Sequence, residues 1–203
     1  MPGSSIEFEQ QHGVGIVRLC SADRTNRLTS ACVLSLTAVL GDLARSPQPL
    51  VITGNDEFFS AGADLREIAE LDGPRAYEFS KMGQELMHAT EDFPAPIYAA
   101  ISGYCMGGGL DLALACRYRI ASPRAVFGHR GAALGLITGW GGTQRLPRLV
   151  GRARALEIFI APQKITAALA LQIGLINAIS DDPLAEAVHR IRLQPARNAG
   201  SIR

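Results

Sequence analysis

The sequence predicts an α/β domain, because short apolar runs alternate along the chain with longer runs that have helical spacing. Apolar runs at residues 50–53, 97–101 and 118–121 are typical of buried strands. Apolar side chains recur every three or four positions over residues 31–44, as in an amphipathic helix. Glycine-rich turns separate the two kinds of run. The 203 residues suffice for one domain with a buried core.

Each remaining element follows from a local signal. Alternation around a His-Gly turn predicts an opening hairpin, and a polar loop follows it. Thr29 or Ser30 is expected to cap the helix over residues 31–44. A Gly-Pro break separates two later helices, and the Gly-rich turn at residues 139–142 leads into a helix that ends near residue 150. The predicted hairpin strands are 6–9 and 15–19, a short strand is 126–127, and the other helices are 64–71, 75–90, 110–116 and 152–160.

Composition excludes several classes of protein. Hydrophobic residues make up 47% of the chain, charged residues 19%, and the net charge is +1, so we expect no nucleic-acid partner and no membrane surface partner. The longest uncharged stretch, residues 93–110, contains prolines and glycines and favours a strand and turn over a membrane span. The N-terminus lacks the pattern of a signal peptide. Four cysteines without metal-like spacing predict no metal site, reduced thiols and a cytoplasmic protein.

Two strand–turn–helix units carry the functional signal. The strand at 97–101 is followed by a turn at 102–106, three glycines at 107–109 and a helix. The strand at 50–53 is followed by a turn at 58–63 and a second helix. Glycines let a backbone approach a ligand closely, and the first N–H groups of a helix lack partners within it. Each unit could aim one N–H at the same oxygen, as in an oxyanion site; close packing alone is the other reading.

Three motifs in these regions resemble the crotonase family, whose best-known members are enoyl-CoA hydratases and isomerases. The motifs are FFSAGADLREI (58–68), ISGYCMGGGLDLALAC (101–116) and LGLITGWGGTQRLPRLVGRARALE (134–157). The resemblance implies a ββα spiral, and an oxyanion hole for an acyl-CoA thioester formed by the backbones of Ala63 and Gly108. It implies no cofactor other than the coenzyme A carried by the substrate.

The resemblance extends from about residue 6 to residue 180, so we expect an acyl-CoA-binding core over residues 1–180. Residues 166–174 and 175–179 resemble the helix and strand that end this core in the family. Residues 181–203 are expected to be a short tail in place of the longer helical region of the family. A homotrimer or a dimer of trimers is implied, although the short tail removes part of the usual contact surface.

Several residues near the motifs are expected to bind substrate. The Asn26-Arg27-Leu28 loop matches a family loop on the adenine side of coenzyme A, although a solvated surface arginine is an alternative for Arg27. Trp140 is expected to be pocket wall or core. Residues around the predicted hole are also expected to contact substrate: Ala61, Gly62, Asp64, Leu65, Tyr104 and Gly107.

The catalytic positions depart from the family pattern. Family hydratases use two glutamates, and the resemblance places Asp111 at the first of these positions and Gly131 at the second. Asp111 could act as a base or orient water, or it could be a structural residue at a helix start. His129 and Arg130 adjoin the empty position: His129 could transfer protons, Arg130 could hold a substrate carboxylate, and either could face outward or pair structurally. A bound anion such as bicarbonate could also fill the space at Gly131.

The sequence therefore predicts an acyl-CoA-binding enzyme that resembles enoyl-CoA hydratase/isomerase, with hydration of a 2-enoyl-CoA as its default reaction. The oxyanion hole alone does not distinguish hydration from thioester hydrolysis, decarboxylation or isomerisation. A catalytically impaired acyl-CoA-binding subunit is the alternative from another class.

Overall fold

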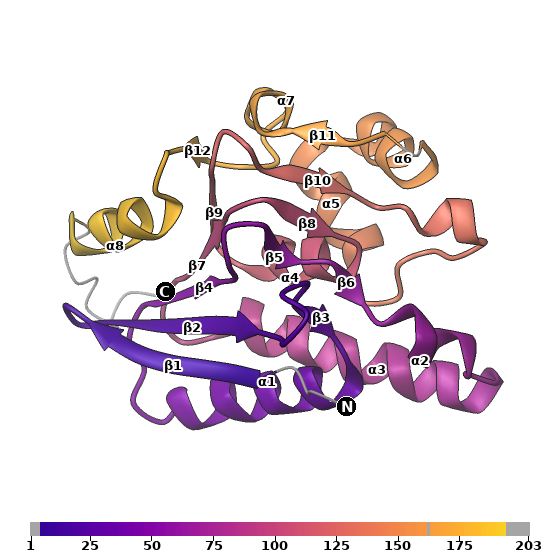
Figure 1. Ribbon diagram of the computed structural model, residues 1–203, viewed down its shortest axis with the longest axis horizontal. Coiled ribbons are helices and arrows are strands. Elements are labelled where there is room, and N and C mark those ends of the chain that lie inside the picture. Colours follow the sequence, from indigo (N-terminus) through magenta and orange to yellow (C-terminus); the bar gives the residue numbers. More distant parts are fainter. Residues whose placement is uncertain (1–4, 162, 194–203) are drawn as a thin grey trace, which may run out of the picture.

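Two sheets form the frame of the protein in the computed structural model, which describes residues 5–161 and 163–193 (Figure 1). The larger sheet has the strand order β1-β2-β4-β7-β9-β12. β1 and β2 form the predicted antiparallel hairpin, and the other neighbouring strands are parallel. β4 and β7 are buried along their whole length, which is why they read as continuous apolar runs. The strands are β1 Ser5–Gln11, β2 Val14–Cys20, β4 Leu50–Thr53, β7 Ile97–Ile101, β9 Tyr118–Ala121 and β12 Ala178–Ile179.

The smaller sheet has the order β11-β10-β8-β5 and consists of very short strands. They are β5 Phe58–Ser60, β8 Tyr104–Met106, β10 Val126–Gly128 and β11 Ile165–Thr166, while β3 Arg27–Leu28 pairs separately with β6 Gly62–Ala63. The prediction that residues 58–63 and 102–106 are simple turns is therefore wrong, because they contain β5, β6 and β8. Strands of two or three residues carry no apolar alternation and form only through their neighbours in the sheet.

The chain alternates between the two sheets. β4 leads to β5, β7 leads to β8, and β9 leads to β10. Helices follow each pair: α2 and α3 come after β5 and β6, α4 after β8, and η1 with α5 after β10. This repetition is the ββα spiral that the family resemblance implied. It brings the ends of successive short strands, and the helix starts that follow them, to one region of the protein.

The helices lie close to their predicted positions. Thr29 caps α1 as expected, with its hydroxyl accepting a hydrogen bond of 3.2 Å from the Cys32 amide. The strand expected at 175–179 is shorter, because only β12 pairs with β9. The helical elements are α1 Ser30–Leu43, α2 Leu65–Ala69, α3 Gly73–Glu91, α4 Gly108–Ala115, η1 Gly131–Leu134 (a 3-10 helix), α5 Gly142–Val150, α6 Arg152–Ile160, α7 Ala167–Gln172 and α8 Pro183–Leu193.

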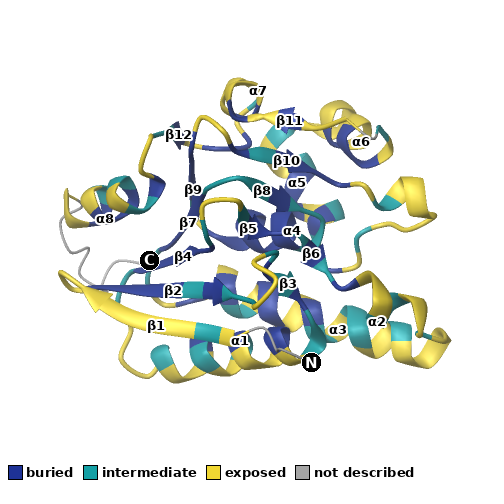
Figure 2. Ribbon diagram, viewed as in Figure 1, coloured by how far each residue is buried: buried dark blue, intermediate teal, exposed yellow. Residues whose placement is uncertain are grey.

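α4 occupies the centre of the main core. All its residues from Gly109 to Ala115 are buried, and Figure 2 shows this helix enclosed by the surrounding elements. Its apolar side chains belong to the same core cluster as those of α1, β7 and α5. The start of α4 is therefore held by packing on all sides, so a functional group placed there has little freedom to move.

α8 covers the opposite face of the larger sheet. Its buried residues Ala187, Val188 and Ile191 pack with Val51 and Tyr98 in a second core cluster. Residues 183–193 are thus part of the folded core, which corrects the prediction that a tail begins at residue 181. The rest of the predicted tail, 194–203, lies outside the described residues. Within the described chain, no helix combines the length and apolar character needed to span a membrane.

Candidate active site

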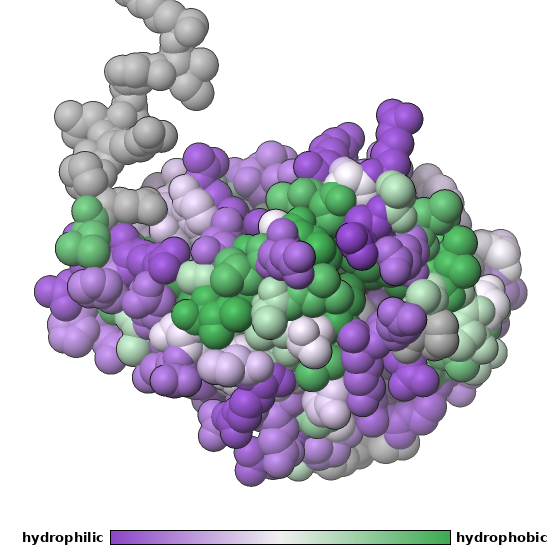
Figure 3. All heavy atoms as spheres, turned by 90° about the horizontal axis from the view of Figure 1, so that it is seen from above, coloured by the Kyte–Doolittle hydropathy of each residue, from purple (hydrophilic) through white to green (hydrophobic). Residues whose placement is uncertain are grey.

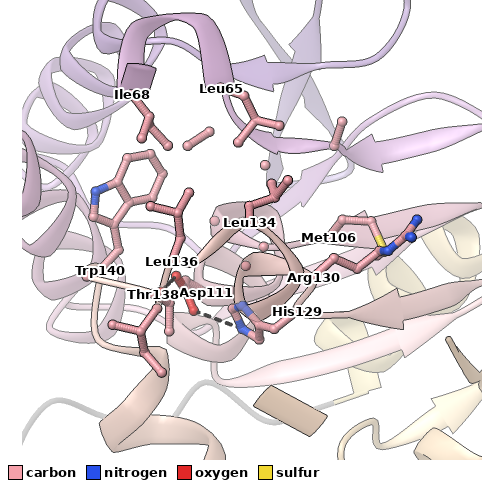
Figure 4. A pocket seen from close by; sticks show the side chains of 18 of the residues that line it. Leu65, Ile68, Met106, Asp111, His129, Arg130, Leu134, Leu136, Thr138 and Trp140 are labelled. Atoms are coloured by element: carbon pink, nitrogen blue, oxygen red, sulfur yellow. Dashed lines mark hydrogen bonds and ion pairs between the residues drawn. The ribbon is translucent and has the colours of Figure 1, made fainter. Parts of the chain in front are cut away.

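A pocket of about 690 Å³ opens where the helix starts and short strands converge. Its lining is mostly apolar and comes from α2, α3, β6, the start of α4 and the segment from β10 to α5. In Figure 4, Trp140 lies at one end of the pocket, Arg130 and Met106 lie at the other, and Asp111 and His129 lie between them. Within the described chain, the ionisable groups of the lining are Tyr104, Asp111, His129, Arg130 and Lys164.

The two glycine turns meet at this pocket. Gly62 has a φ of +92°, and a Cβ built on it would lie 2.6 Å from the Met106 carbonyl oxygen and 3.0 Å from the Gly108 nitrogen. Glycine is therefore required here, both for its backbone conformation and for the close approach of the second turn. A Cβ built on Gly108 would lie 3.4 Å from the Ala63 nitrogen, so the backbones of Ala63 and Gly108 are neighbours. Gly108 is the first residue of α4, so its N–H has no partner within the helix.

Asn26 holds the first turn in place. Its side-chain amide donates to the carbonyl oxygens of Phe58 (2.9 Å) and Phe59 (3.4 Å). Ser60 donates from its hydroxyl to the Asn26 carbonyl (2.7 Å) and accepts from the Gly62 amide (3.1 Å). Asn26 is 1% exposed and does not line the pocket, so the prediction that it contacts substrate is replaced by a structural role. The role of Ser60 was not predicted, because its only signal in the sequence is a polar residue within an apolar strand.

Three other predicted binding residues also lie outside the lining. Leu28 is fully buried in the main core, so it offers no surface to a ligand. Arg27 forms an ion pair with Asp23. Asp64 caps α2, and its hydrogen bonds from Arg66 lower the pKa of its carboxyl group. The remaining predicted binding residues do line the pocket: Ala61, Gly62, Leu65, Tyr104, Gly107, Arg130 and Trp140.

Asp111 is the buried carboxylate of the pocket. It lies in the first turn of α4 and is 1% exposed. One carboxylate oxygen, Oδ2, accepts a short hydrogen bond from the Thr138 hydroxyl, and the other, Oδ1, lies 3.3 Å from His129 Nε2. Gly142 provides the space for Oδ1, because a Cβ there would lie 2.1 Å from that atom. Thr138 and Gly142 were missed from sequence, although both belong to the Gly-rich third motif.

His129 follows β10 directly and is almost completely buried. Its ring packs against that of Phe159 from α6, with 5.1 Å between ring centroids. The contact between His129 Nε2 and Asp111 Oδ1 is close but does not have the geometry of a hydrogen bond. Neither atom has another hydrogen-bond partner in the described part of the chain.

Position 131 is closed by its own loop. A Cβ on Gly131 would lie 2.8 Å from the Leu136 carbonyl oxygen. The Leu136 amide in turn donates a hydrogen bond of 2.9 Å to the Gly131 carbonyl. A side chain at residue 131 would therefore require the backbone of this loop to move. The pocket keeps the buried carboxylate of Asp111, with His129 beside it.

Trp140 is both wall and core. Its indole N–H donates to the Phe79 carbonyl (3.2 Å), and the two rings are 5.2 Å apart. The indole occupies a slot formed by two glycines, since a Cβ on Gly83 would lie 2.1 Å from it and a Cβ on Gly108 2.5 Å. The exposed Arg130 lies at the other end of the pocket, and the Lys164 ammonium, also in the lining, lies 5.1 Å from the centre of the Tyr104 ring. The pocket thus has an apolar end and a basic end.

Comparisons with known proteins show the family of this chain. A family model described as enoyl-CoA hydratase/isomerase matches residues 9–199. The crotonyl-CoA hydratase of Syntrophomonas wolfei is 36% identical over 184 residues, which are 88% of this chain and 70% of that protein. The short-chain-enoyl-CoA hydratase of Clostridium acetobutylicum is 34% identical over 179 residues, 87% of this chain and 69% of that protein.

A solved structure gives the same result for the fold. The crystal structure of an enoyl-CoA hydratase from Bacillus anthracis matches with a TM-score of 0.87 at 32% identity, covering 92% of this chain and 75% of that chain. The chain belongs to the enoyl-CoA hydratase/isomerase family, as its three motifs predicted, and is an enzyme of that type.

Proposed function

We propose that this protein binds an acyl-CoA thioester, stabilises its enolate between the N–H groups of Ala63 and Gly108, and hydrates a 2-enoyl-CoA. The observation that carries the proposal is the close approach of the two turns beside Asp111, at the floor of one pocket. An enolate oxygen carries the negative charge that develops in the reaction, and two converging backbone donors stabilise it most where water is excluded. The hydratase names of the relatives support the same class of reaction.

Asp111 is the side chain we assign to the chemistry. Hydration adds the oxygen of water to the β-carbon and a proton to the α-carbon. A carboxylate within the pocket can orient the attacking water and accept its proton. The Thr138 hydroxyl donates to Oδ2 and holds the carboxylate at the start of α4.

The two ends of the pocket suit the two ends of such a substrate. Leu65, Ile68 and Trp140 offer an apolar wall to an acyl group. Arg130 and Lys164 offer positive charge to the phosphates of coenzyme A. Arg27 lies outside the pocket lining and forms an ion pair with Asp23. Its contact with coenzyme A stays a prediction.

The test is hydration of crotonyl-CoA, followed as the loss of absorbance of the conjugated thioester. We expect turnover by the wild type and a loss in kcat on the order of 10²–10⁴ in Asp111→Asn, because a carboxylate that accepts a proton is removed. Asp42→Asn is the matched control, since Asp42 is an exposed residue of α1 away from the pocket. A wild type that binds the thioester without hydrating it would contradict the hydration step.

Gly131 supports a second candidate. Because no side chain is present at this position, a reaction that needs one carboxylate and an oxyanion hole fits as well: thioester hydrolysis, decarboxylation or isomerisation. Release of free coenzyme A, or of carbon dioxide from malonyl-CoA, would identify the first two. Binding without any turnover would identify an acyl-CoA-binding subunit.

Assembly into a homotrimer or a dimer of trimers is part of the same proposal. Figure 3 views the molecule from the side on which α6 and α7 lie in Figure 1, and hydrophobic residues gather there. Large apolar side chains of these helices are exposed: Leu156, Ile160, Leu169 and Leu171. Exposed apolar area of this kind is typical of protein contacts. Sedimentation of the purified protein measures its oligomeric state. The cytoplasmic location of the protein also stays a prediction.

A further inference from the structure

Hydration requires a proton donor for the α-carbon as well as a group that orients water. Position 131 supplies no such donor, and the Leu136 carbonyl occupies the space beside it. His129, two positions before Gly131 on the segment that follows β10, lines the pocket.

The ring of His129 is oriented toward the carboxylate of Asp111. Figure 4 shows its ring directed at the carboxylate, and Nε2 lies 3.3 Å from Oδ1. Both side chains are more than nine-tenths buried. Thr138 occupies the other carboxylate oxygen, and Phe159 packs against the imidazole ring. Oδ1 and Nε2 make no hydrogen bond to any of the described residues, although a buried polar atom without a partner is costly.

We propose that His129 and Asp111 form one proton-holding pair, which replaces the second carboxylate of a two-carboxylate hydratase site. His129 acts through Asp111 and is a positioning residue, whereas Asp111 faces the reacting atoms. The inference rests on the proposed function, because it concerns the proton that the enolate takes up. It adds a role for His129 that the oxyanion hole and Asp111 do not require.

The proton balance closes within the pair. As the oxygen of water bonds to the β-carbon, the electron pair of the C=C bond moves onto the thioester to form the enolate, and one proton leaves the water for the pair. The pair then returns that proton to the α-carbon as the enolate collapses. The pair ends in its starting state, so no further reactant is needed.

The surroundings of the pair suit this role. Imidazole has two ring nitrogens that can each accept or donate a proton, so it can exchange a proton with a carboxylate beside it. Phe159 on α6 packs an apolar ring against the imidazole, and Thr138 bonds the carboxylate of Asp111. The other charged side chains of the lining, among the described residues, are Arg130, which is exposed, and Lys164, which lies over Tyr104.

The test separates proton transfer from hydration. Butyryl-CoA is saturated and cannot be hydrated, so exchange of its α-protons in deuterated water reports proton transfer at the α-carbon alone. His129→Gln keeps an N–H donor near the position of Nε2 but cannot take up a proton. His129→Asn is a second variant, with a shorter amide. His189→Gln on the exposed side of α8 is the matched control.

We expect His129→Gln and His129→Asn to lower both α-proton exchange and the kcat of crotonyl-CoA hydration by about 100-fold. The Kd for butyryl-CoA and the thermal unfolding midpoint should stay near those of the wild type, and His189→Gln should behave as wild type. Exchange at the wild-type rate in either folded variant would overturn the pair. A wild type that binds butyryl-CoA without exchanging its α-protons would overturn it too. Wild-type exchange that depends on His129, without hydration of crotonyl-CoA, would refute the proposed hydration and leave the pair standing.

Discussion

The Gly62→Ala substitution tests the physical basis of the oxyanion hole. A φ of +92° costs a residue with a Cβ about 1–2 kcal/mol. The new methyl group would also lie 2.6 Å from the Met106 carbonyl and 3.0 Å from the Gly108 nitrogen, and such overpacking costs roughly 1–3 kcal/mol. Both neighbours are backbone atoms, so the two turns must move apart. We therefore expect a loss of about 2–5 kcal/mol in the free energy of unfolding.

The same movement separates the N–H groups of Ala63 and Gly108. Loss of one oxyanion donor lowers kcat by about 10²–10³, and we expect an effect of that order on crotonyl-CoA hydration. Gly13→Ala is the matched control, because Gly13 has a φ of +78° in the hairpin turn and a Cβ there would meet no atom within 4 Å. Gly13→Ala should lose only the conformational part of the stability and none of the activity.

Urea unfolding and initial rates of hydration measure the two effects. If Gly62→Ala kept the wild-type kcat, or if it lost no more stability than Gly13→Ala, the close approach of the two turns would not determine the positions of the two N–H donors. Equal losses of activity in the two variants would instead indicate a general effect of backbone strain.

Two further predictions concern stability and reactivity. Arg119 is 4% exposed and donates to the carbonyl oxygens of Cys116 (2.6 Å) and Leu175 (2.8 Å). Arg119→Ala should therefore lower the free energy of unfolding by about 2–5 kcal/mol. Arg45→Ala is the control and should change this free energy little, because Arg45 is exposed. A loss below about 1 kcal/mol in urea would contradict the importance of these buried bonds. Burial raises the pKa of Cys116 to about 12 and that of Cys32 to about 11, and raises the pKa of Cys105 well above its usual range. An alkylating reagent at about pH 8 should therefore modify the half-buried Cys20 first, as read by mass spectrometry, and labelling of Cys105 in the folded protein would refute the burial argument.

The elements predicted well are those whose signal is local. β4, β7 and β9 are apolar along most of their length, and α1, α3 and α6 have either clear spacing or clear breaks at their ends. The strands of the smaller sheet were missed because their two or three residues pair with segments far away in sequence. α8 was taken for a tail, because eleven residues of mixed polarity do not reveal that one face packs on a sheet.

The site shows the same division. The motifs predicted Ala63, Gly108 and Asp111 as neighbours, and all three line the pocket. The residues that hold them were not predicted, because the Ser60, Thr138 and Phe159 contacts join segments separated by tens of residues. Asn26 was placed in the substrate site, whereas its buried amide is bonded to the strand that carries the first turn.

The sequence by itself determined the α/β class, the family, the two glycine turns and the absence of a side chain at position 131. These depend on residue type and on short spacings, which a chain displays without being folded. Only the tertiary structure decided that the Leu136 carbonyl closes position 131 and that His129 turns toward Asp111. The directions of side chains and the space between loops are set by packing. Packing brings together residues that are far apart in the sequence, and no local pattern predicts such contacts.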